Sequence, residues 1–277
     1  MNILDNHIHS HFSMDSKEDM ENIIKRAINL GVKHLTFTDH LEYEDNKFTL
    51  DLDKYVESIY KYKEKYKKDI NLLTGIEIGY ESNIKNEIED IINKYPFDFV
   101  LCSTHSINSK KIYKDDFFKG LTQKESYNKY YQSIIDTTKE FKNFDIYGHL
   151  DYIIRYGNYE TKALYDDYKD IIDEVLKSII SIGKGIEINT SGYRYNLDNV
   201  HPSIDVLKRY KELGGEILTI GSDAHKAVDI CSGFDKAYEI LDYLGFKYVC
   251  LFEKRKCKFI KVEKDIIHSA WYNKFRV

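Results

Sequence analysis

The sequence is poor in cysteine: its 277 residues include only four, Cys102, Cys231, Cys250 and Cys257. None of them forms a C-x-x-C pair, and they are too few and too scattered to build a disulfide framework. The lack of close cysteine pairs also argues against a structural zinc site made of thiolates. We therefore expect four free thiols, as in a protein from a reducing compartment.

An excess of charge of one sign and a long apolar run are also missing. The 41 basic and 46 acidic residues nearly balance, so the net charge of -5 offers no electrostatic attraction for nucleic acid. No apolar stretch approaches the length that spans a bilayer, and Met1-Asn2-Ile3 leads into the first motif without room for a signal peptide. We expect a cytoplasmic protein that acts on a small molecule, with neither nucleic acid nor membrane as a partner. The sequence leaves its oligomeric state open.

What the sequence does have is a regular alternation of strand and helix patterns. Seven strand-like runs, separated by amphipathic helical patterns, end in or near His, Asp, Glu, Asn or Ser, and no Pro/Gly/Ser-rich linker interrupts them. This alternation predicts an α/β barrel of the TIM type or a close variant, because a barrel brings the carboxyl ends of all its strands to one site. Two more strand patterns, at 248–252 and 258–262, predict a closing hairpin.

Two local features refine this prediction. Ser16 is expected to cap the first helix, with Asp19 three residues later and Gly31 as its C-terminal stop. Residues 34–40 alternate as one continuous strand, which places His40 and Asp39 on opposite faces.

Metal-ligand patterns occur near both ends of the chain. His7 and His9 are two residues apart on a predicted strand, so their side chains point to the same face. Asp223 and His225 repeat that spacing after another apolar run, and Glu77 lies between two isoleucines in the middle of a strand. Together with other residues at or near strand ends, the predicted metal ligands are His7, His9, Asp15, His40, Glu77, His105, His149, Asp223 and His225. These nine donors are too many for one ion, and they suit several ions that share Glu77 as a bridge.

All nine donors are nitrogen or oxygen atoms, which favours Zn, Mn, Fe or Co. A metal cluster lowers the pKa of bound water towards neutrality and makes hydroxide available as a nucleophile. The remaining histidines, including His11, His34 and His201, follow no strand end, and we assign them no role in the site. Asp39 is expected to orient a neighbouring ligand or to cap a loop.

Arginine is scarce beside lysine, and two arginines fall in loops just beyond predicted strands. Arg155 follows Gly148-His149-Leu150-Asp151, and Arg194 follows Ser191-Gly192-Tyr193. A planar guanidinium suits the recognition of an oxyanion, and phosphate is the obvious oxyanion beside a metal cluster. We predict that both arginines bind a substrate phosphate; the alternative for each is a surface ion pair.

Taken together, these motifs resemble those of the PHP (polymerase and histidinol phosphatase) superfamily. The resemblance rests on residues 5–16, Thr38-Asp39-His40, Gly75-Ile76-Glu77, Ser103-Thr104-His105, Gly148–Asp151, Glu187–Gly192 and Gly221–His225. The chain resembles the monofunctional histidinol-phosphatase branch of this superfamily in two respects. It has the loops that carry Arg155 and Arg194, and the resemblance extends from residue 3 to about residue 262.

The resemblance implies a distorted TIM-like (β/α)7 barrel with a C-terminal β-hairpin, forming a single PHP-type domain over residues 1–277. It also implies three divalent metal ions, with Zn, Mn or Fe as candidates. By position, His7, His9, Glu77 and Asp223 would hold the first ion, and Glu77, His105 and His149 the second. Asp15, His40 and His225 would hold the third.

The function that follows from this resemblance is hydrolysis of L-histidinol phosphate to L-histidinol and phosphate, in histidine biosynthesis. A hydroxide that bridges two metals would attack phosphorus in line. Asp151 and Glu42 are candidates for contacts with the amine and imidazole of the substrate. The predicted catalytic residues are Glu77, Asp223, His225, Arg155 and Arg194.

Three alternatives remain open at this point. One is a phosphoesterase of the same superfamily that acts on a nucleotide or on phosphotyrosine. Another is an amidohydrolase-like metal hydrolase, although such enzymes usually use a bridging Lys where this chain has Glu77. The third is a non-catalytic barrel that binds metal or a partner.

Overall fold

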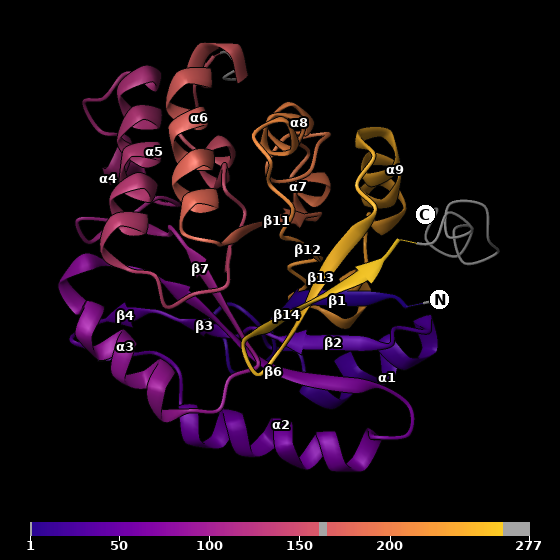
Figure 1. Cartoon of the computed structure of the whole chain (residues 1–277). Helices are drawn as coiled ribbons and strands as arrows, with labels where there is room; N and C mark the ends of the chain where they lie inside the picture. The colour runs from indigo at the N-terminus through magenta and orange to yellow at the C-terminus, as the bar shows by residue number, and fades with distance from the viewer. Residues whose placement is uncertain (1, 161–164, 263–277) are drawn as a thin grey trace.

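A parallel sheet rolled almost into a barrel lies at the centre of the computed structural model, which describes residues 2–160 and 165–262 (Figure 1). Neighbouring strands pair in parallel throughout. Their order is β1 (Leu4–Ile8), β2 (His34–Phe37), β6 (Asn71–Gly79), β7 (Phe99–Ser103), β10 (Ile146–Tyr147), β11 (Gly185–Asn189) and β12 (Leu218–Gly221). The predicted (β/α)7 barrel is therefore confirmed; residues 263–277 of the predicted domain lie outside the described residues.

Helices surround the sheet on its outer side (Figure 1). The longer ones are α1 (Met20–Leu30), α2 (Leu52–Tyr66), α3 (Lys85–Lys94), α5 (Gln123–Glu140), α6 (Tyr165–Ser181), α8 (Ile204–Glu212) and α9 (Phe234–Leu244). Short helical turns lie between them: η1 (Ser82–Ile84), α4 (Asp115–Phe118), η2 (Tyr152–Arg155), α7 (Ser191–Arg194) and η3 (Ala227–Asp229). Each longer helix buries one apolar stripe; in α1 this stripe includes Met20, Ile23, Ile24 and Ala27. None of the described helices combines the length and the apolar composition that crossing a membrane requires.

The first helix begins later than the sequence predicts. Asp19, not Ser16, is its N-cap, and the Asp19 side chain accepts a hydrogen bond from the backbone N–H of Glu21. The hydroxyl of Ser16 instead donates to the carbonyl of His225, across the top of the barrel. The predicted stop is confirmed, because Gly31 takes the left-handed conformation, with φ 80°, that ends many helices.

The predicted strand over 34–40 is interrupted at Thr38-Asp39. Its second part, β3 (His40–Leu41), pairs with β6 and places His40 opposite Glu77. The interruption arises because the Asp39 carboxylate turns away to accept hydrogen bonds from the backbone N–H groups of Ser10 and Ser13. Asp39 thus caps a loop, as the sequence suggested, and simple alternation across this segment was the wrong expectation.

The amino end of the barrel interior is apolar. Phe99 and Leu101 of β7 and Ile146 of β10 pack there against Cys250 and Phe252. The last two belong to β13 (Tyr248–Glu253), which forms an antiparallel hairpin with β14 (Lys256–Lys261). The predicted C-terminal hairpin is confirmed, and it closes this end of the barrel.

All four cysteines of the chain are free thiols, as expected.

Two smaller antiparallel hairpins lie beyond the carboxyl ends of the strands. One joins β4 (Tyr43–Glu44) to β5 (Lys47–Phe48), and the other joins β8 (Ser106–Ile107) to β9 (Lys110–Lys111). They bring Glu44 and Lys111 to the wall of the pocket described below.

Candidate metal centre

The first and last strands of the sheet meet at their carboxyl ends. The backbone N–H of His9 donates to the carbonyl of Ala224 at 2.9 Å, and that of Asp223 donates to the carbonyl of His7 at 2.8 Å. These two hydrogen bonds bring together side chains that are more than two hundred residues apart in the sequence.

The turn that follows β12 is shaped for this close approach. A side chain at Gly221 would lie 2.2 Å from Glu187 Oε1 and 2.4 Å from the Cβ of His7, so only glycine fits there. Asp223 adopts φ 53°, a left-handed conformation that costs free energy in residues other than glycine. Arg194 Nη2 donates to the carbonyls of both Ser222 and Asp223 at 2.7 Å and so holds the turn in place.

The first group of donor atoms lies at the carboxyl end of β1. The Nε2 atoms of His7 and His9 are 2.9 Å apart, and Asp223 Oδ1 lies 3.6 Å from the former and 3.3 Å from the latter. Glu77 Oε2 lies 3.3 Å from His7 Nε2 and 3.4 Å from His9 Nε2. Four ligands that bind one zinc ion tetrahedrally at ~2.0–2.1 Å are themselves roughly 3.3 Å apart. These side chains therefore have the spacing of one metal site.

A second group lies on the other oxygen of Glu77. His149 Nε2 is 2.9 Å from Glu77 Oε1, and His105 Nε2 is 3.4 Å from the same atom. The two imidazole nitrogens are 3.3 Å apart. Each oxygen of Glu77 thus faces its own set of histidines, so this carboxylate could take part in two metal sites.

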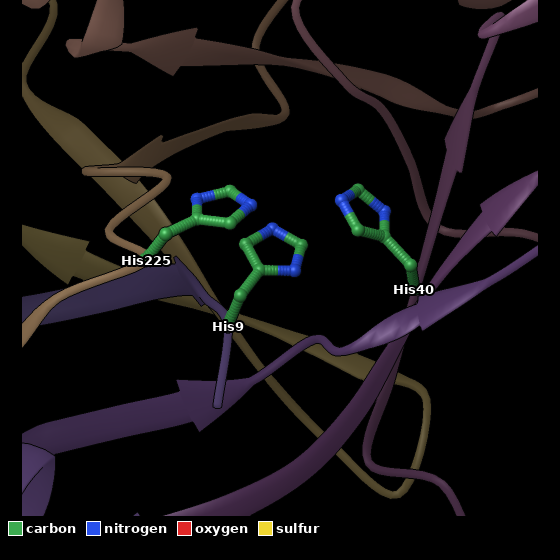
Figure 2. A group of neighbouring side chains, drawn as sticks. All are labelled: His9, His40 and His225. Atoms are coloured by element: carbon green, nitrogen blue, oxygen red, sulfur yellow. The ribbon is translucent and has the colours of Figure 1, made fainter. Parts of the chain in front are cut away.

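The third group lies nearest to the pocket. Asp15 Oδ2 is 3.1 Å from His225 Nε2 and 3.5 Å from His40 Nε2. Figure 2 shows His40 and His225 extending from separate segments towards the space above His9. The ring of His9 stacks on both of them, with centroids 4.2 Å and 4.1 Å away, so His9 stands between the first and third groups. The nine predicted ligands are thus brought into one continuous cluster.

The cluster contains buried polar atoms that a metal ion could satisfy. Glu77 Oε2 and His40 Nδ1 are both buried without a hydrogen-bond partner, although they lie only 2.8 Å apart. Two buried polar atoms without partners cost free energy, and one cation bound by both of them would offset this cost. The donor atoms are imidazole nitrogens and carboxylate oxygens, which suit Zn, Mn or Fe.

The electrostatics of the cluster keep several donors in the form that binds metal. Burial alone would raise the pKa of Glu77, but His7, His40 and His105 hold that pKa well below its usual range. Burial and the neighbouring His225 and His40 hold the pKa of His9 well below its ordinary value, so its ring is neutral. His105 is different: burial lowers its pKa, but the carboxylates of Glu42 and Glu77 outweigh this and raise the pKa to about 9, so its ring would release a proton on binding a metal ion.

A second layer of side chains orients these ligands. Glu187 Oε1 lies 2.7 Å from His7 Nδ1, and Glu42 Oε1 lies 2.6 Å from His105 Nδ1. Ser13 Oγ lies 3.1 Å from His9 Nδ1 and donates to Asp39, which therefore also supports a ligand indirectly. Such partners fix the tautomer and the orientation of a ligating imidazole.

Glu187 is not among the site residues predicted from the sequence, although a signal for it was available. Glu187 lies between Ile186 and Ile188, as Glu77 lies between Ile76 and Ile78. A carboxylate between two isoleucines on a buried strand must point to the opposite face from them. Applied to both positions, the same reasoning would have placed Glu187 in the barrel interior.

The cluster opens into a pocket of ≈ 370 Å³ at the carboxyl end of the barrel. Its wall includes Tyr152, Tyr156 and Tyr195 on one side and Glu42 and Lys111 on another. Glu42 is engaged with both His105 and Lys111, and Asp151 is buried away from the pocket against His201. Both acids that were suggested as contacts for the amine and imidazole of the substrate therefore already have partners within the protein.

The structure places the two predicted phosphate-binding arginines differently. Arg155 lines the pocket, with its guanidinium 4.1 Å from the ring centre of Tyr195 and its Nη2 atom 3.7 Å from Asp223 Oδ2. Arg194 lies behind Asp223, where Nη2 binds backbone carbonyls and Nη1 is buried with no hydrogen-bond partner. Of the two, only Arg155 lines the pocket wall.

The chain belongs to the PHP domain family, whose model matches residues 5–191. Two relatives that match almost the full length of the chain are a histidinol-phosphatase and a probable histidinol-phosphatase. The chain is 32% identical over 260 residues to the histidinol-phosphatase of Lactococcus lactis, an alignment that covers 92% of this chain and 96% of the relative. A probable histidinol-phosphatase of Clostridium acetobutylicum is 35% identical, with 93% and 99% of the two chains covered.

A solved structure agrees with this placement. The crystal structure of histidinol phosphate phosphatase from Lactococcus lactis, complexed with zinc, L-histidinol and phosphate, superposes with a TM-score of 0.83. The match covers 93% of this chain and 99% of that one at 31% identity. A putative histidinol phosphatase from Listeria monocytogenes shares the fold at 18% identity, with a TM-score of 0.75 over 84% of this chain and 99% of that one.

Proposed function

We propose that this protein is a metal-dependent phosphomonoesterase that hydrolyses L-histidinol phosphate to L-histidinol and phosphate, a step of histidine biosynthesis. One observation carries the proposal: Arg155 lines the same pocket as a cluster of nitrogen and oxygen donors centred on Glu77. The full-length similarity to histidinol-phosphatases supports the choice of substrate.

The metal content that we propose is three divalent ions, with zinc as the first candidate. His7, His9, Glu77 and Asp223 would hold the first ion, and Glu77, His105 and His149 the second. Asp15, His40 and His225 would hold the third, which is the most open to solvent because Asp15 is largely exposed. The distances within each group support this division, since each distance quoted above is 3.6 Å or less.

Bound divalent ions supply a hydroxide nucleophile at neutral pH and offset the negative charge that moves onto the phosphoryl oxygens. The residues of the chain have complementary tasks. Arg155 presents a delocalised positive charge for the phosphoryl group, and Tyr152 and Tyr195 hold its guanidinium by contact with its faces. Arg194 supports the same chemistry by holding the strained turn at Asp223 through the carbonyls of Ser222 and Asp223.

A phosphate-release screen tests the substrate assignment. Protein stripped with a chelator and reloaded with zinc or manganese would be assayed with histidinol phosphate, a nucleoside monophosphate and phosphotyrosine. We expect kcat/KM to be highest for histidinol phosphate and activity to disappear in the stripped protein. Comparable rates on all three esters, or a clear preference for another, would overturn the assignment and leave the metal site standing.

A further inference from the structure

Within residues 2–160 and 165–262, His201 is a buried histidine beside the site whose place no metal pattern explains. It is fully buried, and its backbone N–H and C=O both pair with Asn189, at the end of β11, at 2.8 Å and 2.7 Å. Both of its ring nitrogens have partners: Nδ1 lies 2.5 Å from Asp151 Oδ1, and Nε2 lies 2.9 Å from Arg155 Nε. A chain of three side chains therefore runs from a buried carboxylate through an imidazole to the pocket arginine.

The partners of His201 determine its tautomer. Arginine can only donate hydrogen bonds, so Nε2 of His201 must accept, and the proton must be on Nδ1, where it is donated to Asp151. Burial and the positive charge of Arg155 lower the pKa of His201, which agrees with a neutral ring. Asp151 is itself fixed, because its second oxygen accepts the backbone N–H of Ser203 at 3.0 Å.

A neutral imidazole has an advantage over a carboxylate in this place. A carboxylate on Nε of Arg155, added to Asp223 Oδ2 at 3.7 Å from Nη2, would compete further with a phosphoryl group for the positive charge of the guanidinium. The imidazole orients Arg155 through Nε while the negative charge of Asp151 stays one ring further away. Ser191 accepts from Nη2 at 2.5 Å, so two sides of the guanidinium are held and its orientation is fixed.

We propose that His201, held in one tautomer by Asp151, is a positioning residue that aims the guanidinium of Arg155 at the phosphoryl group. This inference rests on the proposed function, because it assumes that an oxyanion binds beside Arg155. The Asp151–His201 pair does not touch the reacting atoms; it acts through Arg155.

The test uses inorganic phosphate, so it does not depend on the identity of the ester. Phosphate binding to the zinc-loaded protein would be measured by calorimetry for the wild type and for His201→Phe, which keeps a ring and loses both hydrogen bonds. We expect weaker binding by roughly tenfold or more, the size of effect seen when a partner behind a metal ligand is lost. His201→Gln, whose amide offers both an N–H donor and an oxygen acceptor, should restore most of the affinity.

Two comparisons separate positioning from a general structural effect. On an Arg155→Ala background, His201→Phe should weaken phosphate binding no further, because residues that act through one another are not additive. His34→Phe, the same replacement at a half-buried histidine at the start of β2, is the matched control and should bind phosphate and zinc as the wild type does.

If His201→Phe does not fold, Asp151→Asn takes its place, because it changes no volume but offers a single acceptor oxygen where His201 and Ser203 need two. Wild-type phosphate affinity in the folded variant, or additive losses with Arg155→Ala, would overturn the inference alone. A zinc-loaded wild type that binds no phosphate would instead overturn the proposed function, and this inference with it.

Discussion

The two ends of the barrel interior have opposite chemistry, although the same strands build both. Along β7, Phe99 and Leu101 face the apolar plug made by Cys250 and Phe252, while Ser103, two residues further on, donates to Glu77. The amino end buries apolar surface and contributes stability. The carboxyl end buries charge, which costs free energy until ions occupy it. Stability and function are thus separated along one axis of the molecule.

Among substitutions that test the contrast between the two ends of the barrel, we expect the largest loss of activity at Glu77. Glu77→Gln keeps the volume and removes the charge that two metal groups share, so kcat should fall by on the order of 10³-fold, about 4 kcal/mol. Metal content, measured by mass spectrometry of the purified protein, should fall as well. Glu216→Gln, at an exposed position outside the barrel, is the control and should change neither quantity. Wild-type metal content in Glu77→Gln would show that the site is misplaced.

At the opposite end, the expected loss is one of stability. Phe252→Ala should lower the free energy of unfolding by about 3 kcal/mol, because it leaves a cavity in the apolar plug. Metal content and kcat of the folded protein should stay unchanged. Urea unfolding measures the effect, with Phe259→Ala on the same hairpin as the control, since that ring is half exposed. A fall in metal content in Phe252→Ala would contradict the separation of the two ends.

Arg155 and Arg194 allow a finer comparison within the carboxyl end. Arg155→Ala should lower kcat/KM by about 10²-fold, or 2.7 kcal/mol, with metal content unchanged, because it removes a preorganised charge from the pocket. Arg194→Ala should have a smaller effect, since its Nη2 is already committed to the carbonyls behind Asp223. Steady-state kinetics on the metal-loaded variants decides the order, and equal losses would place both arginines on the substrate.

The smallest expected effect is a change in the titration of His105 in the metal-free protein. Burial lowers its pKa and Glu42 and Glu77 raise it to about 9, so the resulting stabilisation is complete below about 6.5 and is lost as the pH rises through 9. Glu42→Gln should lower the midpoint by at least roughly one unit, about 1.4 kcal/mol. Histidine signals in NMR spectra follow this shift. If the midpoint of the His105 titration stayed unchanged in Glu42→Gln, Glu42 would not be the group that raises the pKa of His105.

Much of the fold could be read from the chain because its signals are local. The alternation of strands and helices, the hairpin near the C-terminus and the stop at Gly31 each depend on residues close together in sequence. The cap at Ser16 and the continuous strand over 34–40 were wrong for the opposite reason. Ser16 is bonded to His225, and the break at Asp39 forms because its carboxylate binds the loop at 10–13, and both partners are distant in sequence.

The sequence by itself determined which residues could ligate metal, because His7-x-His9 and Asp223-x-His225 each place two donors on one face of a strand. It also indicated the barrel, since the strand period and the connecting helices leave few other arrangements. The tertiary structure alone decided how these donors divide around Glu77 and which arginine faces the pocket. It alone linked His201 to Arg155. The physical reason is that a hydrogen bond between residues 46 positions apart has no trace in local periodicity and forms only where the barrel closes.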